Sequence, residues 1–254
     1  MTRKRRRPLH NRRDESKTQK LRLKAIWERR PAAKRLKSAK HPVTGELTKY
    51  LWGRIGLDVG GVILTRLYPD KRRIDKGNFK EDSKLFPLAV ESVRLFVLLF
   101  GAGNVVIVKN DDKKGVVASE TYETLEKRFD NFFKRTGFKV DNWLVTKHRT
   151  QKGGFCRRHF LNFFADDKAQ VGRYLPKETI FLWYGSEADE DDVHRLAVSK
   201  RARDGRLHAL YVPDWPHLVS EVLRYYPNWE ETMVGRPQEE QDEINRLYKL
   251  LMAA

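Results

Sequence analysis

Ile55-Gly56-Leu57-Asp58 is predicted to be a short apolar strand that ends on an acid. On the C-terminal side of this strand, the hydrophobic pattern alternates between strand-like runs and segments with helical spacing. Further strands are predicted at 104–108, 143–145, 163–165, 179–184 and 207–212, and helices at 87–100, 119–135, 152–158, 191–200, 215–226 and 239–251. Strands that alternate with helices predict an α/β fold with a mostly parallel sheet that is covered on both faces.

Polar residues follow three of these strands. Asp58 ends the first, Lys109-Asn110 follows the second, and Asp166-Asp167 follows 163–165. Parallel strands deliver their carboxyl ends to one rim of the sheet, and ligands of open α/β sheets bind beyond that rim. We therefore expect these side chains to converge.

Three carboxylates, those of Asp58, Asp166 and Asp167, cannot all stay ionised side by side at low cost. Either one pKa rises or a divalent cation neutralises the cluster. Oxygen ligands without nearby Cys or His favour Mg²⁺ over zinc, and Mg²⁺ beside a carboxylate fits phosphoryl chemistry. A structural interpretation stays open: Asp58 caps a turn, and Asp166-Asp167 begins the next helix.

The order and spacing of several motifs resemble the haloacid dehalogenase-like (HAD) superfamily. The resemblance covers roughly residues 54–226. It rests on Asp58-Val59-Gly60-Gly61-Val62, on Val105-Val106-Ile107-Val108 followed by Lys109, on Lys152, on Phe163-Phe164-Ala165-Asp166-Asp167-Lys168, and on Phe133-Lys134-Arg135-Thr136-Gly137 and Val212-Pro213-Asp214-Trp215.

The resemblance implies a Rossmann-like fold and Mg²⁺-dependent phosphoryl transfer through a phospho-aspartate. It makes Asp58 the nucleophile and a metal ligand, and gives Gly60 a backbone carbonyl on Mg²⁺. It makes Lys152 the charge balance for the nucleophile and the phosphate, and Asp167, with or instead of Asp166, a holder of the metal.

Two positions depart from that pattern. Gly60 stands where phosphatases of the superfamily usually carry a second Asp, and Lys109 stands where a small hydroxyl residue is expected. The Lys109 cation either binds phosphate in catalysis or pairs with Asp58 in place of the metal. The alternative is therefore a catalytically inactive HAD-like protein that binds RNA or ribonucleoprotein. The segment 66–86, where this superfamily inserts cap elements, predicts little or no cap and an open site that suits a macromolecular substrate.

Charge is distributed unevenly along the chain. The protein has 52 Lys/Arg and 34 Asp/Glu, a net charge of +18, of which residues 1–40 carry +14 with 17 Lys/Arg against 3 Asp/Glu. So many like charges with so few apolar residues predict a disordered arm, or one that becomes helical on a polyanion. The arm is a solubilising tail, a nuclear or nucleolar address, or a nucleic-acid-binding element. Its candidate nucleic-acid contacts are Arg3, Lys4, Arg5, Arg6, Arg7, Arg12 and Arg13.

The sequence predicts four parts: the arm 1–40, a linker 41–53, the α/β domain 54–235 and a C-terminal helix 236–254. The lone cysteine, Cys156, excludes an intramolecular disulfide framework and is expected to be a buried structural thiol. No apolar run is long enough to span a bilayer, so no membrane partner is expected. An intracellular location fits best, nuclear or nucleolar in a eukaryote and otherwise cytoplasmic.

Overall fold

Six parallel strands form one sheet in the computed structural model, which describes residues 49–65, 84–110, 132–185 and 209–254. The strand order is β3-β2-β1-β4-β5-β6, with β1 in the interior of the sheet. The predicted α/β class and parallel sheet are thereby confirmed, in a Rossmann-like arrangement. The strands are β1 Ile55–Leu57, β2 Val105–Asn110, β3 Trp143–Thr146, β4 Phe163–Asp166, β5 Ile180–Tyr184 and β6 Ala209–Val212.

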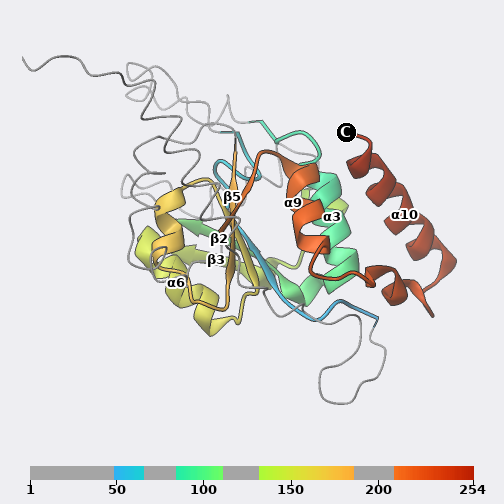
Figure 1. The fold of residues 1–254 in the computed structure, drawn as a ribbon, viewed down its shortest axis with the longest axis horizontal. Coiled ribbons are helices and arrows are strands. Elements are labelled where there is room, and N and C mark those ends of the chain that lie inside the picture. Colours follow the sequence, from blue (N-terminus) through green and yellow to red (C-terminus); the bar gives the residue numbers. More distant parts are fainter. Residues whose placement is uncertain (1–48, 66–83, 111–131, 186–208) are drawn as a thin grey trace, which may run out of the picture.

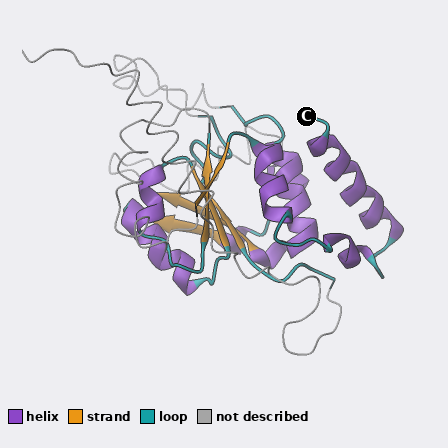
Figure 2. Ribbon diagram, viewed as in Figure 1, coloured by secondary structure: helices purple, strands orange, loops and turns teal. Residues whose placement is uncertain are grey.

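Helices cover both faces of this sheet (Figures 1 and 2). The described helices are α3 Ala89–Phe100, α5 Phe132–Thr136, α6 Arg149–Arg158, α9 Trp215–Leu223 and α10 Gln238–Met252, with short 3₁₀ turns at Ala102–Asn104 (η2), Val140–Asn142 (η3), Ala169–Arg173 (η4) and Trp229–Met233 (η5). None of them is long and apolar enough to cross a membrane.

Alternation along the strands divides the core into two parts. Ile55 and Leu57 of β1 point into the larger part, which α3, α9 and α10 also fill. Val106 and Val108 of β2, with Phe164 of β4, point into a smaller part on the α6 side. A strand that is buried on both faces cannot slip in register without burying polar groups, so the register of β1 is well determined.

The last helix packs onto α3 and α9 and adds a further layer beyond them (Figure 1). Ile244, Leu247 and Leu251 are fully buried in the larger core. Just before α10, the buried Arg236 side chain donates to the carbonyls of Thr232 and Lys49 and pairs with Glu240 at 3.3 Å. This guanidinium ties the segment before β1 to the start of α10.

Several element bounds differ from the prediction. β2 continues through Lys109 to Asn110, and β4 includes Asp166. Helix α6 begins three residues before Lys152, because His148 and Gln151 form a reciprocal capping box. The polar residues of that first turn carry no apolar periodicity, so the sequence pattern does not reveal it.

Other predicted features lie outside the described residues. These are the arm 1–40 with its seven named cations, the first part of the 41–53 linker, the 191–200 helix, most of the 66–86 insertion and most of the 119–135 helix. The end of that last helix is described as α5.

Adjacent glycines in α6 differ in their surroundings. A Cβ on Gly153 would lie 1.9 Å from the carbonyl oxygen of Tyr174, whereas a Cβ on Gly154 would meet no described atom within 4 Å. Gly153→Ala should lower the free energy of unfolding by about 1–3 kcal/mol through overpacking. Gly154→Ala should raise it by about 0.5–1 kcal/mol, because alanine favours a helix interior. Urea denaturation of the two variants checks this, and equal effects would contradict the contact between α6 and Tyr174.

Candidate active site

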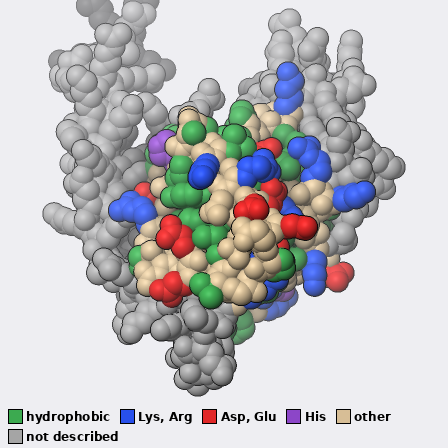
Figure 3. Space-filling model, turned by 90° about the vertical axis from the view of Figure 1, so that its right-hand side faces the viewer, with side chains coloured by type: hydrophobic (Ala, Val, Ile, Leu, Met, Phe, Trp, Pro, Cys, Tyr) green, Lys and Arg blue, Asp and Glu red, His purple; other side chains and the backbone are tan. Residues whose placement is uncertain are grey.

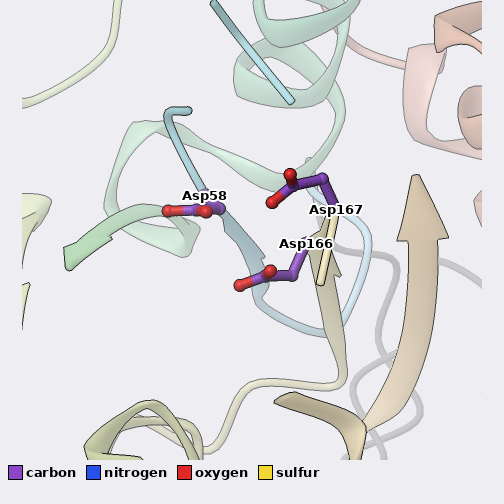
Figure 4. Close-up of side chains that lie close together, drawn as sticks. All are labelled: Asp58, Asp166 and Asp167. Atoms are coloured by element: carbon purple, nitrogen blue, oxygen red, sulfur yellow. The ribbon is translucent and has the colours of Figure 1, made fainter. Parts of the chain in front are cut away.

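Three carboxylates meet at the carboxyl ends of β1 and β4, as the sequence predicts. Leu57 lies beside Ala165 in the parallel ladder, and the backbone N–H of Asp58 donates to the Ala165 carbonyl at 2.9 Å. The next residues in each chain segment, Asp58 and Asp166, therefore lie side by side. Asp167 follows directly, and one oxygen from each of the three carboxylates lies within 4.8 Å of the others (Figure 4).

Lys152 reaches this cluster from α6 on the side of the smaller core. Its Nζ lies 2.9 Å from Asp58 Oδ1 and 2.6 Å from Asp166 Oδ2. The three side chains are at most 6 % exposed, so the ion pairs are shielded from water. The ammonium also lies 5.7 Å from the centre of the Phe164 ring. The arrangement fixes the orientation of the Asp58 carboxylate.

Burial and charge act in opposite directions on the ionised groups. Burial alone lowers the pKa of Lys152, but Asp166 and Asp58 outweigh it and raise that pKa above its ordinary value. Burial, together with the like charge of Asp58, raises the pKa of Asp166, although Lys152 and the N–H of Lys168 oppose this. Lys152 therefore stays protonated and compensates the charge of both carboxylates.

Asp167 is less enclosed than its neighbours. Its side chain is 14 % exposed, and its Oδ2 lies 3.7 Å from Lys168 Nζ. Among these five described side chains, three carboxylates face two ammonium groups, which leaves one negative charge. A divalent cation would reverse that sign and make the rim attractive to a phosphate.

The loop after β1 is tightly organised. The carbonyl of Val59 accepts from the N–H groups of Ile63 at 3.0 Å and Leu64 at 2.8 Å, while Val62 and Ile63 are buried. Gly61 has a φ of 88°, and a Cβ there would lie 2.4 Å from the Asp167 carboxyl carbon. A glycine is therefore required for Asp167 to approach the loop.

These residues fit a hard divalent cation such as Mg²⁺. The donors are carboxylate oxygens, and the chain brings them together from two adjacent strands. Asp58, Asp166 and Asp167 could hold the ion; the Gly60 carbonyl remains a prediction. Cys156 is buried as predicted, and burial raises the pKa of its thiol, so it is unsuited to act as a nucleophile or a metal ligand.

The two ends of the predicted cap insertion lie close together beside the rim. Leu64 forms an antiparallel bridge with Leu85, and the N–H of Thr65 donates to the Lys84 carbonyl at 2.8 Å. The insertion therefore leaves and re-enters the body at one place, immediately after the loop that follows Asp58.

Lys109 lies within β2, where Lys109 is the register partner of Val145 in β3. The predicted position just beyond the strand is wrong by two residues, because the ladder with β3 continues to Asn110 and Thr146. The catalytic role of Lys109 stays a prediction.

Two contributors escape sequence reasoning. One is Lys168, whose N–H donates to Asp166 Oδ1 at 2.8 Å and whose ammonium faces Asp167. The other is Gly61, whose partner Asp167 is more than a hundred residues away. The pair of glycines after Asp58 was the available signal for Gly61.

Comparison with known proteins does not identify the family. No protein-family model matches the sequence, and no curated protein matches it.

Removal of the buried ammonium should be costly. Lys152→Met leaves Asp58 and Asp166 uncompensated and should lower the free energy of unfolding by about 3–5 kcal/mol. Lys168→Met, at a side chain that is 18 % exposed, should cost under about 1 kcal/mol. Thermal or urea denaturation measures both. A Lys152→Met variant as stable as the wild type would contradict the ion pairs.

Proposed function

We propose that the protein is a Mg²⁺-dependent phosphohydrolase of HAD type that works through an aspartyl-phosphate on Asp58. The observation that carries the proposal is the convergence of Asp58, Asp166 and Asp167 around the buried ammonium of Lys152. Each element of the site has a counterpart in phosphoryl transfer: a carboxylate nucleophile, a fixed cation and oxygen ligands for a metal.

The reaction has two displacements at phosphorus. In the first, an Asp58 oxygen forms a bond to phosphorus while the ester P–O bond breaks. The ester oxygen leaves with the bonding electrons and takes a proton from water. In the second, water attacks the phosphorus, loses a proton to solvent, and the bond to Asp58 breaks, which releases phosphate and restores the carboxylate.

Lys152 supports both steps from one position. Its bond to Asp58 Oδ1 holds the carboxylate in place, and its bond to Asp166 keeps the ammonium there while Asp58 is esterified. A preorganised cation in a site shielded from water stabilises developing phosphate charge more strongly than the same cation in solvent. Mg²⁺, when bound by the carboxylates, screens the phosphate and orients it for in-line attack.

The substrate class proposed for this site is a phosphate on a macromolecule. The basic arm 1–40 would bring the enzyme to nucleic acid or ribonucleoprotein, in the nucleus or nucleolus of a eukaryotic cell and otherwise in the cytoplasm. The +14 charge of the arm supports this.

Asp58→Asn tests the nucleophile. The variant should lose at least about a thousandfold in Mg²⁺-dependent hydrolysis of para-nitrophenyl phosphate, because an amide cannot form the phospho-enzyme. Asp141→Asn, at an exposed acid in η3, serves as the matched control and should keep full activity. If Asp58→Asn turned over at the wild-type rate, the mechanism would be wrong.

A second candidate is an inactive HAD-like protein that binds RNA or ribonucleoprotein. Two features of the sequence favour it: Gly60 offers no carboxyl for general acid catalysis, and Lys109 stands where the HAD pattern has a small hydroxyl residue. In that case the triad is a structural ion-pair network.

Metal binding separates the two candidates. Calorimetric titration with MgCl₂ should show one site in the wild type and a loss of affinity of at least about tenfold in Asp167→Asn, since even outer-shell partners contribute tenfold to a hundredfold. Asp242→Asn, at an exposed acid in α10, should bind like the wild type. Wild-type protein that binds no Mg²⁺ would favour the inactive candidate.

A further inference from the structure

Helix α6 belongs to an acid-free part of the chain. The 24 residues from Asn142 to Ala165 include five Lys/Arg and no Asp or Glu. Of the five cations, Lys152 is buried in the active site, whereas Arg157 and Arg158 are exposed on the last turn of the helix. On the opposite side of the molecule, acidic and basic side chains are intermixed over the surface (Figure 3). The exposed part of α6 therefore presents cations and contains no carboxylate.

The turn that follows α6 exposes an aromatic ring on a residue whose backbone conformation is unfavourable for a non-glycine residue. The N–H of Phe160 donates to the Arg157 carbonyl at 3.3 Å, and the N–H of Leu161 donates to the Cys156 carbonyl at 2.9 Å. This is a Schellman motif, in which the left-handed position is usually glycine. Here that position is occupied by Phe160, which has a φ of 52° and is 80 % exposed. A strained, exposed phenylalanine gains nothing from packing, which points to a partner.

A second flat surface lies next to it. The Phe155 and His159 rings are stacked, with an interplanar angle of 6° and centroids 5.9 Å apart, and the Arg158 guanidinium lies 5.5 Å from the Phe155 centroid. Arg54 donates to the His159 carbonyl at 3.0 Å and holds this turn in place. Burial and the charges of Arg54 and Arg158 lower the pKa of His159, which favours the neutral, stackable ring.

The helix surface beside these groups is open. Gly154 is exposed, and the space where its Cβ would be is vacant among the described residues. Unlike Gly153, it has no neighbour in the described part of the chain that requires a glycine. A glycine in a helix interior weakens the helix, but it allows a partner to approach the helix backbone closely at this position.

We propose that Gly154, Phe155, Arg157, Arg158, His159 and Phe160, together called the α6 surface, bind single-stranded nucleic acid. Arg157 and Arg158 contact phosphates, and unpaired bases stack on Phe160 and on the Phe155–His159 pair. Nucleic acid supplies negative charge to pair with the arginines and flat base faces to stack on the aromatic rings. An acidic peptide supplies only the charge, and a duplex keeps its base faces covered.

The α6 surface is separate from the catalytic rim. Lys152 lies near the start of the helix and reaches the carboxyl ends of the strands, whereas Phe160 lies just before Phe163, the first residue of β4. The proposal therefore goes beyond the phosphohydrolase function and does not depend on it.

Fluorescence anisotropy with the full chain tests the proposal. The probes are a fluorescein-labelled 12-nucleotide RNA of mixed sequence and the same RNA as a duplex. Phe160→Gly should weaken single-strand binding about fivefold to a hundredfold, the range for loss of one stacked base, and should change duplex binding less than twofold. Its melting temperature should be equal to or above that of the wild type, because glycine is favoured at that position. Loss of binding therefore cannot be attributed to unfolding.

The two arginines are tested by salt dependence. The double variant Arg157→Gln, Arg158→Gln should reduce the slope of log K against log salt by about 1.4, or about 0.7 for each phosphate contact. Arg246→Gln with Lys249→Gln removes the same charge from exposed positions of α10 and should leave the slope unchanged. Val234→Ala, at an apolar residue that is 72 % exposed, is the control for Phe160→Gly.

Crosslinking locates the RNA contact on the α6 surface even where the basic arm 1–40 contributes most of the RNA affinity. RNA with 4-thiouridine should crosslink within 154–160, and Phe160→Gly should reduce that product. Asp242→Asn, at an exposed acid of α10, should bind RNA and crosslink like the wild type. Unchanged affinity and crosslinking in Phe160→Gly would overturn the proposal. The proposal would also be overturned if a twelve-residue poly-glutamate bound the wild type as tightly as the RNA and lost affinity by the same factor in Phe160→Gly. That result would indicate a protein partner.

Discussion

The buried ammonium of Lys152 between Asp58 and Asp166 is the interaction on which the site depends. Two carboxylates at the ends of adjacent strands would repel each other and lose their hydration on burial. One ammonium at 2.9 and 2.6 Å offsets both costs, but only if β1, β4 and α6 keep their mutual positions. The ion pairs thus require this packing, and the packing holds the carboxylates together at the carboxyl ends of β1 and β4.

The strand order gives this site its place. Because β1 lies between β2 and β4, and the ladder pairs Leu57 with Ala165, the acids that follow are delivered to one point of the rim. Helix α6, which supplies Lys152, lies on one face of the sheet and ends at Arg158, just before Phe160. In the proposed account one helix serves two purposes: its first half completes the catalytic site, and its last turn contacts nucleic acid.

Sequence reasoning reached the sheet and the three carboxylates because both follow from local pattern. Apolar runs that end in Asp58 and in Asp166-Asp167, combined with the convergence of parallel strands, are sufficient to predict the cluster. The first turn of α6 was missed because a capping box between His148 and Gln151, and not apolar spacing, starts the helix. The contact of Gly61 with Asp167 and the exposure of Phe160 depend on long-range packing and backbone conformation, which no local pattern encodes.

Mn²⁺ in place of Mg²⁺ tests directly whether the carboxylates around Lys152 hold a divalent cation. A crystal soaked in MnCl₂ should give one anomalous difference peak at coordination distance from Asp58 and Asp167, with Lys152 still paired to Asp58 or Asp166. A crystal at the same Mn²⁺ concentration without a peak there, and with Lys152 bridging the two aspartates unchanged, would contradict the account.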